Sequence, residues 1–403
     1  MPLNECGFWV DSIMHNGQAY APKLKCAKLY VAATSQHVGK TTTTLGLISA
    51  LQLQGLNVGY CKPVGQKYVE IPGGDRVDKD AHLFSDFMGF QLVPELHSPV
   101  ILGPGAVTGY LDNPEKTNYP QQIQQAACVL EGMHDVVVYE GTGHPGVGGV
   151  VDVSNADVAQ MLGAGVIMVV EAGIGSTIDE LLLNLALFQS RGVEVVGVII
   201  NKTRPEKMEK VQHYVGKKLE KLGIPILGTI PYASELGMPL MRTVQRAVKG
   251  DILAHPERMN NFVAGILAGS LIDTTNFKGC KGLLLMVSSA RLGDSLQKLR
   301  KIGERKEIEH SLLSGLLVTG QPNIKPEDWE YINHFKIPVI HAPMDTYEAV
   351  LEFSRIEVKI NTQTPWKVAK AVELFQQQID QDKLMGLLKP QSTPYSPKWR
   401  RVV

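Results

Sequence analysis

Short apolar runs alternate with amphipathic segments through the first half of the chain. The runs are rich in β-branched residues and predict buried strands, whereas apolar positions three to four residues apart predict helices. We expect strands over 29–33, 57–62, 135–139, 166–170, 193–200 and 224–230, and helices over 42–54, 80–87, 121–133, 156–162, 178–191 and 207–222. Strands that alternate with helices are joined by right-handed crossovers, so this pattern predicts an α/β fold with a parallel sheet covered by helices on both faces.

Two stretches interrupt the alternation. Residues 70–79 are polar and rich in Gly and Asp, which predicts a loop. Residues 89–120 contain several Pro and Gly residues and predict an irregular excursion over the active-site face.

A second alternation of the same kind begins near Gly282. It predicts strands over 283–287, 313–319 and 337–341, and helices over 294–302, 326–333, 346–353 and 365–378. A chain of 403 residues is long for one hydrophobic core, so two domains are expected. The predicted organisation is an N-terminal extension (1–27), a first α/β domain (28–240), a helical connection (241–275), a smaller C-terminal α/β domain (276–385) and a flexible tail (386–403).

Composition excludes several functions without changing this fold. The 40 basic and 40 acidic residues balance, so neither nucleic acid nor a membrane surface is an expected partner. No apolar run approaches membrane-spanning length, and the first residues lack the pattern of a secretory signal. The five cysteines are scattered without metal-ligand spacing, which suits a reducing compartment better than a disulfide framework. We therefore expect a cytoplasmic protein.

The segment Thr34–Thr42 carries the strongest chemical pattern because Gly39, Lys40 and Thr41 stand between a strand and a helix. Backbone N–H groups in such a loop form a concave nest for phosphate, and the helix N-terminus adds positive charge. A lysine here reaches the outer phosphates and a hydroxyl holds Mg²⁺. The alternative is a chance Gly-Lys-Thr at a helix start. His37, inside the loop, either touches a phosphate or fills the exposed tip.

Polar residues follow several other strands, and parallel strands direct their carboxyl ends to one crevice. Lys62 begins a Lys-Pro-Val triplet and faces the phosphate loop, unless it is simply a solvated lysine. Glu140 begins Glu-Gly-Thr-Gly, which favours a Mg²⁺ site over a tight turn. Asp80 either binds metal or, like Asp78, caps a helix. Asn201 is able to read a nucleotide base or to form a turn, and Lys202 and Pro231 lie near the same place in the predicted fold.

The order of these motifs resembles the dethiobiotin synthetase family of P-loop proteins over roughly residues 28–240. The resemblance implies that Lys40 and Thr41 bind the phosphates and Mg²⁺ of ATP, that Lys62 acts at the transferred phosphate, and that Asp80 and Glu140 hold the metal. Asn201 would meet adenine. The nucleotide site implied by the motifs comprises Thr34, His37, Val38, Gly39, Lys40, Thr41, Thr42, Asn201, Lys202 and Pro231.

The C-terminal domain looks like a DRTGG domain, a regulatory module. The similar positions are Arg291-Leu-Gly-Asp294, Val318-Thr319-Gly320 and Asp345-Thr346-Tyr347. The two domains in this order look like the N-terminal half of long bacterial phosphotransacetylases. No acetyltransferase domain follows in these 403 residues, so that activity is not implied. Lys40 is often missing in phosphotransacetylase relatives, and its presence here indicates that ATP is bound.

Two features depart from the synthetases. Gln66 stands four places after Lys62, where those enzymes have a small hydroxyl residue, and the stretch 89–120 has no counterpart. Diaminopelargonate is therefore not the expected substrate. We expect an ATP- and Mg²⁺-dependent synthetase or ligase that phosphorylates a carboxylate or carbamate of an unidentified small-molecule acceptor. The alternatives are a nucleotide-sensing regulatory protein with little or no turnover, and a scaffold that uses neither site. The resemblance also implies a homodimer.

Overall fold

The computed structural model describes residues 26–268, 272, 281–305, 310–321, 323–356, 358–362 and 364–388. They form two compact units. The first unit contains the chain up to Tyr232 together with the chain from Ile360 onward, and the second contains Ala233–Lys359. Most of the predicted extension (1–27) and of the predicted tail (386–403) lies outside the described residues.

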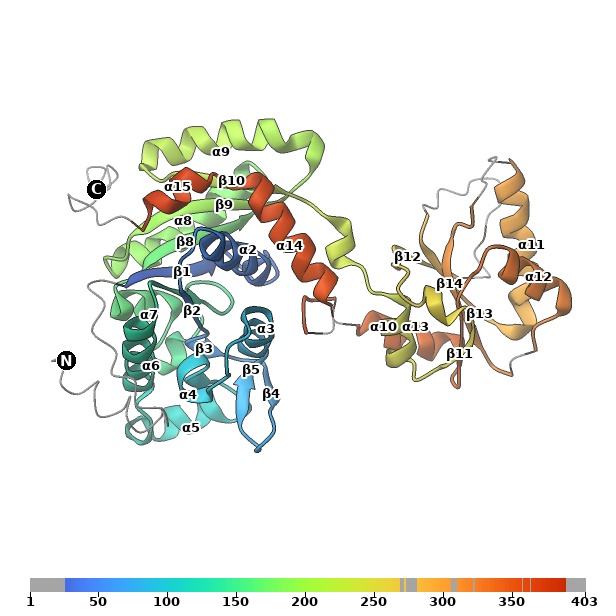
Figure 1. Cartoon of the computed structure of the whole chain (residues 1–403), viewed down its shortest axis with the longest axis horizontal. Helices are drawn as coiled ribbons and strands as arrows, with labels where there is room; N and C mark the ends of the chain where they lie inside the picture. Colours follow the sequence, from blue (N-terminus) through green and yellow to red (C-terminus); the bar gives the residue numbers. More distant parts are fainter. Residues whose placement is uncertain are drawn as a thin grey trace. The chain divides into compact units, whose positions relative to one another are not determined.

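The first unit is built on a parallel sheet of six strands, as the alternating pattern predicts (Figure 1). The strand order places β1 between β7 and β8, so that the chain winds away from β1 in both directions. Across the sheet the strands are β10 (Ile226–Pro231), β9 (Val195–Thr203), β8 (Gly165–Glu171), β1 (Ala27–Ala33), β7 (Val136–Glu140) and β2 (Val58–Cys61).

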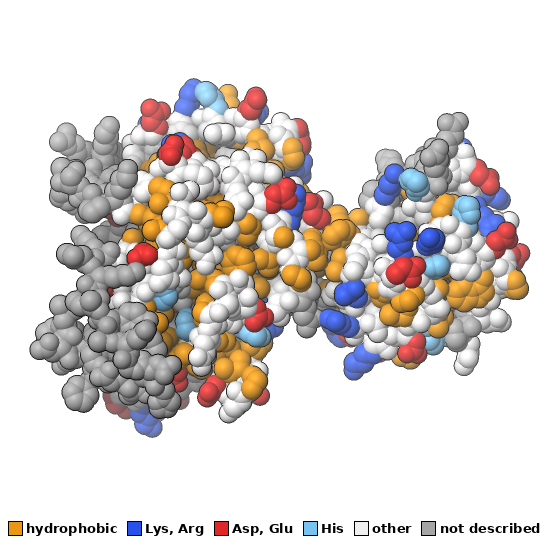
Figure 2. Space-filling model, in the orientation of Figure 1, with side chains coloured by type: hydrophobic (Ala, Val, Ile, Leu, Met, Phe, Trp, Pro, Cys, Tyr) orange, Lys and Arg blue, Asp and Glu red, His pale blue; other side chains and the backbone are white. Residues whose placement is uncertain are grey.

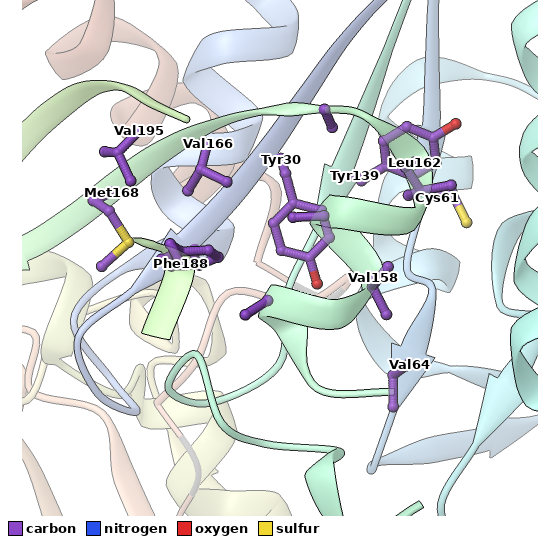
Figure 3. Packing of buried hydrophobic residues seen from close by; sticks show 14 of the residues in the cluster. Tyr30, Cys61, Val64, Tyr139, Val158, Leu162, Val166, Met168, Phe188 and Val195 are labelled. Carbon is purple, nitrogen blue, oxygen red and sulfur yellow. The ribbon is translucent and has the colours of Figure 1, made fainter. Parts of the chain in front are cut away.

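Helices cover both faces of this sheet. Four helices share one core with the sheet: α6 (Tyr119–Met133), α7 (Asn155–Leu162), α8 (Gly175–Ser190) and α9 (Met208–Leu222). Tyr30, Tyr139 and Phe188 are among the large side chains buried there (Figure 3). The other face is covered by α2 (Lys40–Leu53) and by α14 (Pro365–Gln378), which packs against α2 and β10. The predicted fold class is therefore confirmed.

The irregular stretch has more secondary structure than the sequence indicates. Residues 70–79, predicted as a loop, contribute to a hairpin of β4 (Tyr68–Glu70) and β5 (Arg76–Asp78), which leads into α3 (Lys79–Met88). The excursion folds as α4 (Pro94–His97), β6 (Val100–Ile101), α5 (Ala106–Asp112) and η1 (Pro114–Lys116). β6 pairs in parallel with β3 (Val64–Gly65), so the excursion is attached directly to the segment that follows Lys62.

The second unit is a smaller α/β unit with a five-stranded sheet in the order β11-β15-β14-β13-β12. The central strands are β13 (Leu283–Ser288), β14 (Leu313–Thr319) and β15 (Val339–Ala342). On one face lie α11 (Ser289–Arg305) and α12 (Pro326–His334), and on the other lie α10 (Met241–Ala247) and α13 (Thr346–Ser354). Short 3₁₀ turns complete the two units: η2 (Gly149–Val151), η3 (Pro205–Lys207), η4 (Ser234–Gly237) and η5 (Pro256–Arg258).

The structure differs from the expectation of a helical connection over 241–275. Among the residues of this segment that the structure describes, α10 is the only α-helix, and β11 (Asp251–Ala254) and β12 (Gly265–Ala268) are the two edge strands of the second sheet. Both strands have four residues, and β11 is exposed at three of them. An edge strand that short, with apolar residues at exposed positions, lacks the alternation that identifies a strand in sequence.

The last long helix has the predicted bounds but lies in the other unit. α14 was expected within a C-terminal domain of 276–385, whereas it packs on α2 of the first unit. A side chain on Gly46 of α2 would place its Cβ 2.2 Å from the Cβ of Phe375, so the two helices touch closely at this glycine. Ile379 then bridges Gly228 of β10, and α15 (Gln381–Gly386) follows.

Candidate functional site

The loop between β1 and α2 has the geometry of an anion-binding turn. Gly39 adopts φ 107°, and a Cβ at this position would lie 2.1 Å from Nδ2 of Asn201, so only glycine fits. Gly39 gives α2 no side-chain cap, and the N–H groups at the start of a helix are groups that bind anions. His37, with φ 63°, is exposed at the loop tip, and the buried Thr34 hydroxyl has no hydrogen-bond partner among the described residues.

Five side chains from separate motifs meet beside this loop. Nζ of Lys40 donates to the carbonyl of Gly143 at 2.7 Å, and the hydroxyl of Thr41 donates to Oε1 of Glu140 at 3.0 Å. Nζ of Lys62 lies 2.7 Å from Oδ2 of Asp80 and 3.1 Å from Oε1 of Glu140. The ends of β1, β2 and β7, with the first turn of α3, thus bring together a hydroxyl, two lysines and two carboxylates.

Burial controls the charges of this cluster. Burial alone would lower the pKa of Lys62, but the carboxylates of Asp80 and Glu140 outweigh it and hold that pKa above its usual range. Burial raises the pKa of Glu140, while Lys62 opposes the rise. Burial also raises the pKa of Asp78 to about 7, again against Lys62. Lys62 therefore stays cationic although its side chain is only 4% exposed.

Asn155, which the sequence analysis missed, fixes the loop after β7. Its Oδ1 accepts from the hydroxyl of Tyr30 at 2.8 Å and from the N–H of Thr142 at 3.0 Å. Its Nδ2 donates to the carbonyls of Thr142 and His144, both at 2.7 Å. These four hydrogen bonds hold the glycine loop in place. The carbonyls of Gly143 and Gly141 in this loop accept hydrogen bonds from Lys40 and Lys62. A buried asparagine at a helix start carries no motif that would have identified it.

The excursion over 89–120 holds the backbone of Lys62 in place. The N–H of Lys62 donates to the carbonyl of His97 at 2.9 Å, and the N–H of Asp78 donates to Oγ of Ser98 at 2.9 Å. Oδ1 of Asp78 accepts from the N–H of Asp80, so Asp78 is the N-cap of α3 and orients Asp80 toward Lys62. Asp78 is therefore the helix cap and Asp80 is an ion-pair partner of Lys62. The metal role expected for Asp80 stays a prediction.

The residues expected near the base lie at the ends of β9 and β10. Nδ2 of Asn201 donates to the carbonyl of Val38 at 2.8 Å, which ties β9 to the phosphate loop. Lys202 forms an ion pair with Glu171 at 3.2 Å, and Pro231 pairs with Thr203 across the two strands. Asn201 is therefore a brace of the loop in this structure, and its contact with adenine stays a prediction.

The donor set fits Mg²⁺ and a nucleotide phosphate chain. Thr41 and Glu140 offer two neighbouring oxygens, the ligand type that Mg²⁺ prefers, while solvent and phosphate oxygens supply the rest in sites of this kind. Lys40, Lys62 and the first N–H groups of α2 supply positive charge for the phosphates. Among the described residues no group of three or more His, Cys, Asp or Glu side chains is placed to hold a metal without such help.

Other expectations concern the surface and the cysteines. No described helix is long and apolar enough to cross a bilayer. On the face drawn in Figure 2, basic and acidic side chains are interspersed. Cys26 and Cys61 are free thiols, whereas Cys128 is disulfide-bonded, which the scattered spacing did not predict.

Comparison with known proteins agrees with this geometry. A phosphate acetyltransferase of Nitratidesulfovibrio vulgaris is 25% identical over 393 residues, which cover 92% of this chain and 53% of that protein. An ATP-dependent dethiobiotin synthetase of Clostridium acetobutylicum is 29% identical over 215 residues, 51% of this chain and 87% of that protein. A hydrogenobyrinate a,c-diamide synthase of Thermobifida fusca is 29% identical over 220 residues, which cover 54% of this chain and 40% of that protein.

These matches confirm the resemblance drawn from the motifs. The chain spans about half the length of the phosphate acetyltransferase that it matches. The family model described as an AAA domain matches residues 27–239, which contain the phosphate loop and the other strand-end motifs. The chain therefore belongs to this AAA domain family of P-loop proteins.

Proposed function

We propose that the first unit is an ATP- and Mg²⁺-dependent synthetase that phosphorylates a carboxylate or carbamate oxygen of a small molecule. The observation that carries this proposal is the second buried lysine. Lys62 lies 3.1 Å from Oε1 of Glu140, which also accepts from Thr41 of the phosphate loop. A protein that only bound nucleotide would need the loop, but not a second cation facing it from another strand.

Each residue has a distinct part in this proposal. ATP supplies the phosphoryl group when bound. Thr41 and Glu140 would hold Mg²⁺, and Lys40 would neutralise the outer phosphates. Lys62, kept cationic by Asp80 and Glu140, stabilises the charge that develops between donor and acceptor oxygens. The braces from Asn155 and His97 keep both lysines in place, so little reorganisation is needed during transfer.

The proposed reaction balances as two displacements. The acceptor oxygen forms a bond to the γ-phosphorus while the bond from that phosphorus to the bridging oxygen breaks, which releases ADP. An amine then attacks the activated carbonyl carbon, and inorganic phosphate leaves. Two of the relatives are named as synthases or synthetases, which supports this reaction class for the first unit.

Release of ADP tests the proposal. Purified protein with Mg-ATP is screened against pools of small carboxylates and amines, and ADP is measured with a coupled assay. A stimulating pool is expected, and Lys62→Ala should abolish the stimulation while ATP still binds. If the Lys62→Ala protein releases ADP as fast as the wild type, Lys62 does not have this role.

A regulatory function is the second candidate because the phosphate acetyltransferase matches extend over both units. In that case the first unit senses ATP and a ligand or partner binds the DRTGG-like unit, with little turnover. ATP binding that survives Glu140→Gln, together with no ADP from any pool, would favour this candidate over the synthetase.

A further inference from the structure

The second unit contains a cavity that none of the residues discussed above lines. It has a volume of about 540 Å³ and lies between the last turns of α11, the last turns of α12 and the chain that enters β14. The opposite end of β14 carries Thr319, one of the positions that resemble the DRTGG signature. Small-molecule sites typically have volumes of roughly 300–1,000 Å³, so the cavity is large enough for a ligand.

The inner part of the cavity is apolar and aromatic. Leu312 and Leu313 are buried in its wall. The rings of Tyr331 and Phe335 meet edge to face, with centroids 4.8 Å apart. The guanidinium of Arg300 lies over the Tyr331 ring at 4.9 Å and also donates to a backbone carbonyl of α12 at 2.9 Å, so it is already engaged. Because Arg300 covers the Tyr331 ring, the apolar surface left for a planar ring consists mainly of Leu312, Leu313 and Phe335.

Among the described residues, the rim of the cavity is polar and carries no surplus of positive charge. Two carboxylates, Glu304 and Glu330, and two imidazoles, His310 and His334, line it together with Arg300. With the histidines counted as neutral, one cation and two anions leave a formal charge of 1 − 2 = −1. Such a rim offers both donors and acceptors to the edge of a ring, and it repels a phosphate group.

We propose that this cavity binds a planar heteroaromatic molecule of about nucleoside size that is neutral or cationic. The aromatic wall binds the ring, and the rim pairs with its donor and acceptor edge. This preference is opposite to that of the phosphate loop, whose lysines and N–H groups suit an anion. The proposal does not depend on the synthetase reaction.

Gly303 offers a direct test because it lines the cavity and no atom lies within 4 Å of the place where its Cβ would be. A Cβ at this position meets no neighbour, and we expect the longer side chain of leucine to extend into the cavity. Gly132 in α6 is a matched control, since it is also helical with open space around it. Adenosine is the probe, and AMP tests the preference against phosphate.

Calorimetry of the full chain should show that adenosine binds about tenfold or more tightly than AMP. Gly303→Leu should weaken adenosine binding by about tenfold or more, and Gly132→Leu should leave it unchanged. No adenosine binding to the wild type, or equal binding to Gly303→Leu, overturns the proposal.

Hydrogen exchange gives a second measurement that needs no variant. Adenosine should slow exchange in peptides from the ends of α11 and α12. Slowing that is absent, or confined to peptides from the phosphate loop, contradicts the assignment of the cavity as the site.

Discussion

Glu140 connects the two cationic parts of the candidate site. Its Oε1 accepts from the hydroxyl of Thr41 and from Nζ of Lys62, and its Oε2 accepts from the hydroxyl of Tyr60 at 3.4 Å. The side chain is fully buried. A buried carboxylate is costly unless it is paired and hydrogen-bonded, so Glu140 and Lys62 depend on each other. Changes at Glu140 should therefore alter both the metal and the lysine.

Glu140→Gln tests the metal role, because glutamine keeps the shape and removes the charge. The Mg²⁺ concentration needed for half-maximal ATP binding should rise by about tenfold or more. Calorimetry at a series of Mg²⁺ concentrations measures this. Glu220→Gln, a change of the same type at an exposed position of α9, should have no effect. An unchanged Mg²⁺ requirement in Glu140→Gln would remove Glu140 from the metal site.

Asp78 should give the first unit a pH dependence of defined sign. Its pKa is about 7 when folded and 3.8 as a free side chain, so between about pH 4 and 7 the folded state keeps a proton that the unfolded state has lost. This contribution is fully present below pH 4 and is lost as the pH rises through 7. The free energy of unfolding should fall over that range by roughly 1–4 kcal/mol.

Asp78→Asn isolates this contribution, because asparagine still offers an oxygen to the N–H of Asp80. Urea denaturation at several pH values should show the variant gaining stability relative to the wild type as the pH rises from 4 to 8. Parallel stability curves for the two proteins would show that Asp78 does not titrate in this range.

At the scale of elements, the contact between α2 and α14 determines how the phosphate loop is supported. α2 begins at Lys40, and its Gly46 lies against Phe375 of α14. Phe375 is fully buried. The helix that carries Lys40 and Thr41 therefore rests on a segment more than 300 positions later in the chain, which has to be in place for the loop to keep its shape.

Gly46→Ala should destabilise the first unit by about 1–3 kcal/mol, because its methyl group overlaps Phe375. Gly132→Ala, in the last turn of α6, should instead be neutral or stabilise by up to about 0.5 kcal/mol, since its Cβ meets open space and glycine is a weak helix former. Chemical denaturation measures both. Effects of equal sign and size would show that the helices do not touch at Gly46.

The elements also show what the sequence determines. The bounds of α14 follow from its apolar periodicity and from Pro365, but periodicity identifies a buried face without naming the element that covers it. Lys62 and Glu140 were predicted to converge because parallel strands end in one crevice. Asn155 and His97 stabilise the same site through contacts distant in sequence, and no local pattern reveals them. β11 was missed because a short, exposed edge strand has no alternation.

At the scale of the whole molecule, the second unit is an insertion in the first. The polypeptide leaves the first unit at Tyr232 and returns to it at Ile360. α14 then completes the face that α2 begins. A family match that ends at residue 239 therefore stops before the first unit is complete.

Two shortened chains test this organisation. Deleting residues 233–359 and joining Tyr232 to Ile360 through a flexible Gly-Ser linker should leave a cooperatively folded unit that binds ATP. Ending the chain at Tyr232 exposes the apolar face of α2, so its melting temperature should fall by about 10 °C or more, or the unit should fail to fold. Equal thermal melts of the two shortened chains would contradict the role of α14.

Titration of ATP into the protein with Mg²⁺, followed by calorimetry, tests the central claim most directly. The wild type should bind ATP at a single site in each chain. Lys40→Ala should weaken this binding by about 100-fold or more, because it removes the cation beside the outer phosphates. Lys28→Ala, at a partly exposed lysine in β1, should leave the affinity unchanged. If the wild type does not bind ATP, or if Lys40→Ala binds it equally well, the phosphate loop is not a nucleotide site.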